Sequence, residues 1–273
     1  MTSFTRDSVA TEGCTINFWS TGGGPLLIFI PGGNGHGRQY DPILPYLALN
    51  FTVATYDRRQ MSSSLPDCLF EEFSPLNPAQ QARDARAIMK SLGFSKTAIF
   101  GSSLGGVIAF QFAVSYPESL SMVLCHEAPT FSLLPDSTKY LDWFFELLGI
   151  YRSFGAEVAQ NAFNVMMVGM EDGLPRQTPE PWNQRNFWAN EVLTASTYCP
   201  DLRQIVNSGV PIAVGYGTKS LNAAYCRTTI AQEEILGCKR IEFPGHHQGF
   251  ETEPVEFANV LLKTLKDLET LAK

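Results

Sequence analysis

The feature that most constrains the fold is a regular alternation of short apolar segments with segments of helical periodicity. The apolar segments hold five or six residues each and lie at 25–30, 51–56, 97–101, 120–125, 210–215 and 239–243. Runs of this length and composition, closed by Gly, Pro or a polar residue, are typical of strands buried on both faces of a parallel sheet. Helical patterns lie at 78–92, 104–116, 222–236 and 254–271. The alternation predicts a mostly parallel, doubly wound α/β sheet.

One long stretch, from about residue 129 to residue 201, interrupts the alternation because it contains no clear strand. Aromatic and methionine side chains gather in it: Trp143, Phe144, Phe145, Phe163, Met166, Met167, Met170, Trp182, Phe187 and Trp188. We expect a helical lid inserted over the sheet, so that residues 1–128 and 202–273 form the two parts of one core domain. These side chains either fill the lid's own core or line a substrate cavity, and both interpretations stay open.

Composition narrows the class of protein and the kind of partner. A chain of 273 residues with 44% hydrophobic and 17% charged residues is typical of a soluble globular protein with one large domain. The excess of 27 acidic over 20 basic side chains gives a formal charge of −7, which argues against nucleic acid or an anionic membrane as partner. No apolar run has the length of a membrane span or signal peptide, so we expect a cytoplasmic protein.

Cysteine and histidine spacing gives no sign of disulfides or metal. The six cysteines lack CxxC spacing, and we expect reduced thiols, as in a cytoplasmic protein. The four histidines form no paired Cys/His pattern, so we predict no metal site and no cofactor. A monomer and a homodimer both remain open.

The candidate nucleophile lies in Gly101-Ser102-Ser103-Leu104-Gly105, between a predicted strand and a predicted helix. A serine on such a sharp turn stands clear of the sheet, and the turn requires small residues two positions before and after it. Ser103 has glycine at both positions and Ser102 does not, so we assign the nucleophile to Ser103. The alternative is a Gly/Ser turn without chemistry, which the strand–turn–helix setting disfavours.

In this motif and its setting the chain resembles the α/β-hydrolase superfamily, and the resemblance extends over nearly the whole length. Members place part of the oxyanion hole at the end of an early strand, where this chain has Pro31-Gly32-Gly33-Asn34-Gly35. The resemblance implies the backbone amides of Gly33 and Leu104 as donors and makes Asn34 a candidate for substrate binding. The family often has His-Gly in place of Pro31-Gly32, so a neighbour of Gly33 is the alternative donor, and a plain glycine-rich turn stays open too.

The family keeps its catalytic base after the last strand, where this chain has Pro244-Gly245-His246-His247. An imidazole there can take the serine proton and return it to the leaving group. Proline often follows the base by seven positions, and Pro254 fits His247. We therefore favour His247 and interpret His246 as a loop histidine that faces backbone or solvent.

The acid has no candidate at the family's usual position, since the turn at residues 215–220 contains no carboxylate. Glu127 directly follows the predicted strand 120–125, and neighbouring strand ends of an open α/β sheet reach the same site. A minority of α/β-hydrolases place the acid here. Asp57 also follows a strand, and we interpret it as structural, tied to Arg58 or Arg59.

Among that minority, the zearalenone lactone hydrolases look similar in three places: Cys-His-Glu with Pro129 after it, the Pro-x-Gly-x-Gly loop, and a Trp-Ala pair matched by Trp188-Ala189. By this resemblance Glu127 would orient His247, and Trp188 would contact substrate. The alternatives are a Glu127 carboxylate bonded to nearby amides and a Trp188 that packs within the lid.

These assignments predict a serine hydrolase that cleaves a carboxylic ester or lactone through an acyl-enzyme on Ser103. The aromatic and methionine-rich lid favours an apolar small-molecule substrate of moderate size. Serine as nucleophile disfavours epoxide hydrolase and haloalkane dehalogenase chemistry, which use aspartate. Carbon–carbon bond hydrolysis and perhydrolysis on the same triad stay open, as does a non-catalytic ligand receptor on a hydrolase scaffold.

Overall fold

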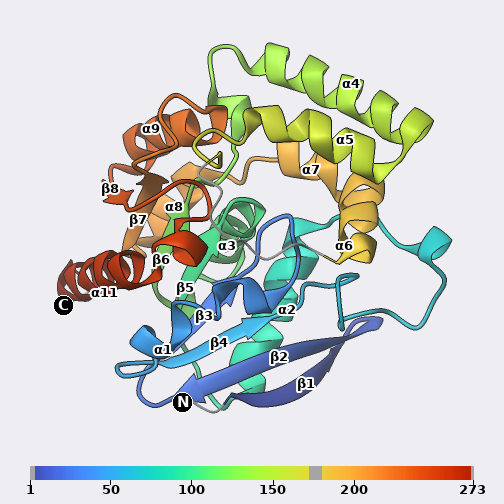
Figure 1. Cartoon of the computed structure of the whole chain (residues 1–273). Helices are drawn as coiled ribbons and strands as arrows, with labels where there is room; N and C mark the ends of the chain where they lie inside the picture. Colours follow the sequence, from blue (N-terminus) through green and yellow to red (C-terminus); the bar gives the residue numbers. More distant parts are fainter. Residues whose placement is uncertain (1–3, 172–179, 272–273) are drawn as a thin grey trace.

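The computed structural model describes residues 4–171 and 180–271 (Figure 1). Within these ranges, eight strands form one sheet in the order β1-β2-β4-β3-β5-β6-β7-β8. Their bounds are β1 (Thr5–Thr11), β2 (Cys14–Gly22), β3 (Leu26–Ile30), β4 (Thr52–Tyr56), β5 (Thr97–Ser102), β6 (Leu120–His126), β7 (Ile212–Gly217) and β8 (Lys239–Phe243). The β1–β2 and β2–β4 pairs are antiparallel, and all pairs from β4 to β8 are parallel. The predicted α/β sheet is confirmed.

Helices cover both faces of the sheet (Figure 1). The α-helices are α1 (Leu44–Leu47), α2 (Pro78–Ser91), α3 (Leu104–Ser115), α4 (Ser137–Phe154), α5 (Ala156–Phe163), α6 (Pro181–Asn186), α7 (Val192–Thr197), α8 (Leu202–Ser208), α9 (Ala224–Leu236), α10 (Gly249–Thr252) and α11 (Pro254–Leu271). Short 3₁₀ turns are η1 (Gly37–Tyr40), η2 (Phe70–Glu72), η3 (Pro117–Ser119), η4 (Phe131–Leu133) and η5 (Asn164–Met166), and η6 (Phe187–Glu191) is a π-helix. The strands and helices predicted from the sequence agree with these bounds to within two residues.

The hairpin of β1 and β2 was not predicted. Strand β1 is mostly exposed and carries polar residues, so it lacks the apolar pattern that identifies a buried strand. Strand β2 does carry a signal, because Cys14, Ile16 and Phe18 are buried and alternate with more exposed residues. This alternation of apolar and polar residues is visible in the sequence and could have identified β2.

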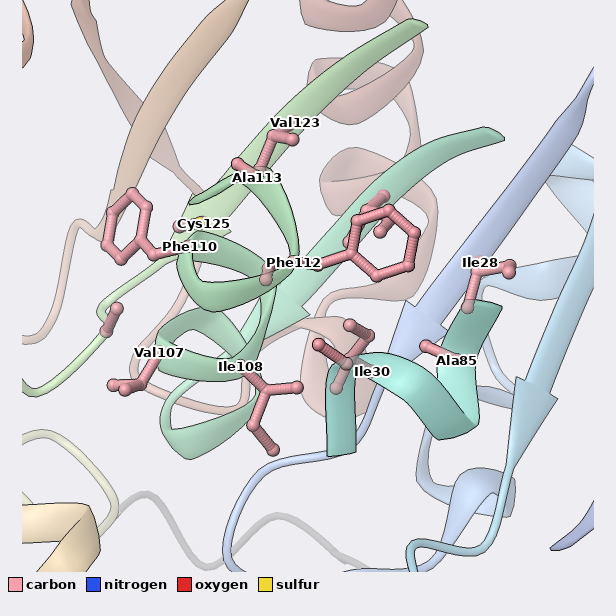
Figure 2. Packing of buried hydrophobic residues seen from close by; sticks show 14 of the residues in the cluster. Ile28, Ile30, Ala85, Val107, Ile108, Phe110, Phe112, Ala113, Val123 and Cys125 are labelled. Carbon is pink, nitrogen blue, oxygen red and sulfur yellow. The ribbon is translucent and has the colours of Figure 1, made fainter. Parts of the chain in front are cut away.

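Helix α3 is buried against the centre of the sheet (Figure 2). It is apolar around most of its circumference because the sheet covers one side and α2 packs on another. The packed residues that Figure 2 labels are Ile28, Ile30, Ala85, Val107, Ile108, Phe110, Phe112, Ala113, Val123 and Cys125. This packing holds the first turn of α3 rigidly at the end of β5.

The opposite face of the sheet packs against α1, η1 and α11, through a second apolar cluster that includes Phe29, Phe100 and Phe257. Helices α4 to α7 lie together in the segment between β6 and β7 (Figure 1). Helices α4, α5 and α7 form a third cluster with η4, η6 and the first turn of α9, built around Phe144 and Trp188. In the described part of residues 129–201 every regular element is helical, and residues 172–179 of that stretch lie outside the described residues.

No helix within residues 4–171 and 180–271 has both the length and the apolar character that a membrane crossing needs. All six cysteines are free thiols, as the sequence led us to expect. Cys14, Cys125 and Cys226 are buried in the packing and Cys68 is exposed.

Candidate active site

The turn between β5 and α3 holds Ser103 with φ of 56° and ψ of −129°. The Ser103 N–H donates to the His126 carbonyl at 2.9 Å. A Cβ on Gly101 would lie 2.3 Å from the Gly105 carbonyl oxygen, and one on Gly105 would lie 2.0 Å from the Ile30 carbonyl oxygen. Both glycines are therefore required by the close approach of α3 to the sheet, which forces Ser103 into a left-handed backbone that serine adopts only under such constraint.

Glu127 and His247 meet although they lie on different loops. Glu127 directly follows β6, and His247 lies between β8 and α10. The His247 Nδ1 atom lies 2.7 Å from Glu127 Oε2, and the Gly217 N–H donates to Glu127 Oε1 at 2.8 Å. Glu127 has φ of 49°, and its N–H donates to the Gly215 carbonyl. Both carboxylate oxygens are thus bonded, one by the imidazole and one by the amide of the last residue of β7.

The charge state of Glu127 follows from these bonds. Burial by itself raises the pKa of the Glu127 carboxyl, but the hydrogen bonds from His247 and the Gly217 amide outweigh it and hold the pKa below its usual range. The carboxyl is therefore ionised at neutral pH. An ionised Glu127 can only accept, so the Nδ1 of His247 carries the proton and Nε2 is left as an acceptor.

Two further residues surround His247. The Tyr225 ring on α9 lies 4.4 Å from the imidazole centroid and restricts its orientation. His246 is buried, and its Nδ1 accepts the Gln248 N–H at 3.0 Å. The predicted contact of His246 with backbone is confirmed, while solvent exposure is excluded.

The glycine-rich loop after β3 lies directly against Ser103. A Cβ on Gly32 would lie 3.1 Å from the Ser103 Cβ, which shows how closely the two segments approach. The Gly35 N–H donates to the Gly32 carbonyl at 3.0 Å and closes a tight turn around Gly33 and Asn34. The Asn34 carbonyl accepts a hydrogen bond from the Asn183 side chain at 2.8 Å.

A cavity of about 880 Å³ opens above these groups. Ser103 and His247 line it together with the predicted Gly33, Asn34 and Leu104. Its apolar wall includes Phe131, Phe144, Phe163, Met166, Met167, Met170, Phe187, Val192, Ala195, Tyr225 and Phe250. Carboxamides also line it: Asn34, Gln39, Gln160, Asn161, Asn164, Gln184 and Gln248. Among the described lining residues the carboxylates are Glu157 and Glu171, and no Lys or Arg is present.

Asp57 is structural, but the predicted arginine partner is wrong. Its carboxylate accepts hydrogen bonds from the Gly37 N–H and from both the N–H and hydroxyl of Ser63. Arg59 instead pairs with Asp84, while Arg58 pairs with Glu191 in the segment between β6 and β7. Both arginines thus bind carboxylates distant in sequence.

Metal ligands do not gather in this structure: in the described ranges no three His, Cys, Asp or Glu side chains form a cluster suited to a metal ion. The polar groups gathered here are the Ser103 hydroxyl and the His247 imidazole at the cavity, the Glu127 carboxylate buried behind that imidazole, and backbone amides. Such a set suits nucleophilic attack with proton transfer.

Comparison with known proteins places the chain in a family. The family model of the alpha/beta hydrolase fold matches residues 25–195. This chain belongs to the α/β-hydrolase family. The curated hydrolase YraK of Bacillus subtilis, itself uncharacterized, is 24% identical over 263 residues, and the match covers 93% of each chain.

Solved structures share the α/β-hydrolase fold over the whole chain. A thermophilic esterase from Thermogutta terrifontis superposes with a TM-score of 0.77 at 18% identity, covering 98% of this chain and 99% of the esterase. Proline iminopeptidase from Mycobacterium smegmatis gives a TM-score of 0.71 at 19% identity, covering 98% and 100%. At such identities the likeness shows the fold alone.

One residue of this α/β-hydrolase that was predicted to contact substrate does not reach the cavity. Trp188 is fully buried, and its Nε1 donates to Gln160 Oε1 at 3.3 Å while its ring packs on Tyr151 and Phe163. The preceding residue, Phe187, lines the cavity instead. Both lie in the π-helix η6, whose wider turn changes which side chain points inward, and sequence periodicity carries no signal for such a turn.

Proposed function

We propose that this α/β-hydrolase cleaves a carboxylic ester or lactone through an acyl-enzyme on Ser103, with His247 as general base and Glu127 as the acid of the triad. The observation that carries the proposal is the 2.7 Å contact between Glu127 Oε2 and His247 Nδ1, beside a cavity that His247 and Ser103 line together. The contact fixes the tautomer in which Nε2 can accept the serine proton.

In the first half of the reaction, the Ser103 hydroxyl oxygen attacks the substrate carbonyl carbon while His247 Nε2 takes its proton. The amides of Gly33 and Leu104 donate to the oxyanion, and each such donor contributes about 3–4 kcal/mol to the transition state. Glu127 stabilises the imidazolium without taking its proton. The tetrahedral intermediate then expels the alkoxide, which receives the proton from His247 Nε2.

In the second half, His247 Nε2 takes a proton from water, and the resulting hydroxide equivalent attacks the acyl carbon of Ser103. Collapse of this intermediate breaks the bond to Ser103, whose oxygen regains the proton, and a carboxylic acid leaves. With a lactone the alkoxide stays tethered to the acyl group, so one hydroxy acid is released at the end.

The substrate class follows from the cavity. A volume of about 880 Å³ suits a molecule of moderate size, and the aromatic and methionine wall favours apolar groups. Carboxamide side chains can bond carbonyl or hydroxyl groups on that molecule. Because Glu157 and Glu171 line the cavity and the described lining holds no cation, a neutral substrate is favoured over an anionic one.

Helices α4 to α7 supply much of the cavity wall, and we interpret residues 129–201 as a lid on a core formed by 1–128 and 202–273. The acid after β6, the Pro31-to-Gly35 loop and the Trp188-Ala189 pair resemble the zearalenone lactone hydrolases. Macrolactones therefore belong among the first substrates to test.

The proposal is tested with a panel of p-nitrophenyl esters, macrolactones and β-diketones. Hydrolysis is measured as the release of product over many turnovers. We expect turnover of neutral esters or lactones, and at least about tenfold lower kcat/KM for p-nitrophenyl hemisuccinate than for the butyrate, a difference of about 1.4 kcal/mol. Ser103→Ala should abolish hydrolysis, whereas Ser102→Ala, the matched control one residue earlier, should retain it.

Intact mass after treatment with a fluorophosphonate identifies the nucleophile independently of substrate choice. A single adduct that disappears in Ser103→Ala supports the assignment. Retained hydrolysis in Ser103→Ala would refute it. Cleavage confined to the β-diketones would replace it with carbon–carbon bond hydrolysis, and tight ligand binding with one turnover would indicate a receptor.

A further inference from the structure

A fully buried ion pair connects the loop after β4 to the segment between β6 and β7. Arg58 is 0% exposed and Glu191 is 1% exposed. Arg58 Nη1 lies 2.8 Å from Glu191 Oε1, and Nη2 lies 2.7 Å from Oε2. Removing two charges from water is costly, so a buried pair of this kind contributes little net stability compared with apolar side chains of equal volume. Its presence therefore calls for a role beyond holding the fold.

Arg58 also holds both ends of the turn that contains Gly33. Its Nε–H donates to the Gly32 carbonyl at 3.1 Å, and its backbone N–H donates to the Gly35 carbonyl at 2.8 Å. The Gly35 N–H closes the same turn onto the Gly32 carbonyl. The Gly32 oxygen therefore accepts two hydrogen bonds from fixed directions.

These bonds set the direction of the Gly33 amide. The carbonyl of Gly32 and the N–H of Gly33 belong to one planar trans peptide, so they point in opposite directions. Any rotation of the Gly32 carbonyl rotates the Gly33 N–H by the same angle. A cation bonded to that carbonyl also polarises the peptide and strengthens its N–H as a donor.

Glu191 fixes the guanidinium in turn. A guanidinium is planar, and a carboxylate bonded to both Nη atoms determines the plane in which Nε–H points. Glu191 ends the π-helix η6, and Phe187 at the start of that helix packs on the turn, since a Cβ on Gly33 would lie 3.1 Å from the Phe187 ring.

We propose that Arg58, oriented by Glu191, is a positioning residue for the oxyanion hole, because it fixes the Gly32–Gly33 peptide so that the Gly33 amide faces the developing oxyanion. This inference rests on the proposed function, in which Gly33 is a donor. By this inference, the segment between β6 and β7 has two roles. It forms part of the cavity wall, and through Glu191 it helps to align the amides of the oxyanion hole.

The test compares three changes: Glu191→Gln, Arg58→Met and the double variant Arg58→Met/Glu191→Met. Each removes the fixed Nε–H or the carboxylate that orients it. Loss of a complete oxyanion donor lowers kcat by about 10²–10³, so misalignment should lower kcat by about 10- to 100-fold. KM should stay within about threefold, because the turn contacts the transition state more strongly than the substrate.

A second readout separates alignment from folding. The affinity of an alkyl boronic acid, whose adduct with serine places oxygen in the oxyanion hole, should fall in parallel with kcat. Single variants leave one charge buried without its partner and should lower the melting temperature, whereas the double variant should recover it. We expect kcat to remain low in the double variant.

The matched control is Arg59→Met/Asp84→Leu, which removes a neighbouring bidentate pair of 2.8 Å contacts that does not touch the Gly32–Gly35 turn. It should lower thermal stability while leaving kcat within about threefold. Recovery of kcat together with stability in the double variant would overturn the inference, as would a Glu191→Gln variant with changed KM and unchanged kcat. Failure of the proposed function can be told apart from failure of this inference. In that case a fluorophosphonate would not label Ser103 of the wild-type protein.

Discussion

His126, the last residue of β6, is a buried histidine whose protonation should be visible in the stability of the fold. Its ring is 0% exposed and packs among phenylalanines, with centroids 5.4 Å from Phe243 and Phe257 and 6.4 Å from Phe100. Neither ring nitrogen has a hydrogen-bond partner among the described residues. Burial, which deprives the charged form of hydration, lowers the pKa of His126 to about 4.

The magnitude and its sign follow from proton linkage. The unfolded chain binds a proton at His126 below its ordinary pKa of 6.5, whereas the folded chain does so only below about 4. The contribution of His126 to stability is thus fully present above pH 6.5 and is lost as the pH falls toward 4. Since one pKa unit equals about 1.4 kcal/mol, the loss reaches about 2.5 kcal/mol at pH 4.5.

The perturbation is His126→Phe, which keeps an aromatic ring in an aromatic environment and removes the titration. The backbone carbonyl that accepts the Ser103 N–H is unaffected. The titratable side chains facing His126 are Glu127, His246 and His247, and all of them remain in the variant. Their pH dependence therefore largely cancels in the comparison.

The assay is urea unfolding followed by tryptophan fluorescence between pH 7.5 and pH 4.5. We expect the wild-type free energy of unfolding to fall by about 2.5 kcal/mol more than that of His126→Phe over this range. Parallel curves for the two proteins would refute the reasoning, since they would mean that the folded imidazole titrates as it does in water.

Three other changes test the site and its supports. Glu127→Gln should lower kcat by about 10⁴, measured against the best neutral ester, because the imidazole loses its oriented tautomer and counter-charge; near-normal kcat would move the acid elsewhere. Trp188→Phe should lower the free energy of unfolding by about 1 kcal/mol, because the hydrogen bond to Gln160 is lost, and should leave kcat within about twofold. A larger loss of kcat would indicate that Trp188 contacts substrate. Gly105→Ala should yield no folded protein by circular dichroism, because its Cβ would lie 2.0 Å from the Ile30 carbonyl oxygen.

Much of the fold was predictable because its signals are local. Strands such as β3 are buried on both faces and read as short apolar runs. Asparagine is a favoured residue just before a helix, and the Asn77 side chain accepts the N–H groups of Ala79 and Gln80 at the start of α2. Strands β1 and β2 were not predicted, since one strand is polar and the other buries alternate residues at the edge of the core.

The residues of the candidate site that lie in a local sequence motif were predictable. The residues whose position depends on contacts between distant parts of the chain were not. The glycines around Ser103 and the loop containing His247 are recognisable from the sequence. The burial of Trp188 depends on a π-helix, for which side-chain periodicity has no signal. Arg58 pairs with Glu191, which lies 133 residues later in the chain, and only folding brings the two side chains together.

The carboxyl end of β7 leaves no room for side chains at its two glycines. A Cβ on Gly217 would lie 2.7 Å from the Gly245 carbonyl oxygen, and one on Gly215 would lie 2.7 Å from the Phe243 ring. Neither glycine can acquire a carboxylate unless the adjoining loop retreats at the same time. A variant built to carry the proposed triad acid at the end of β7 would therefore need coordinated substitutions in two places. Close packing at both glycines thus excludes a simple carboxylate substitution there, while Glu127 already lies against His247.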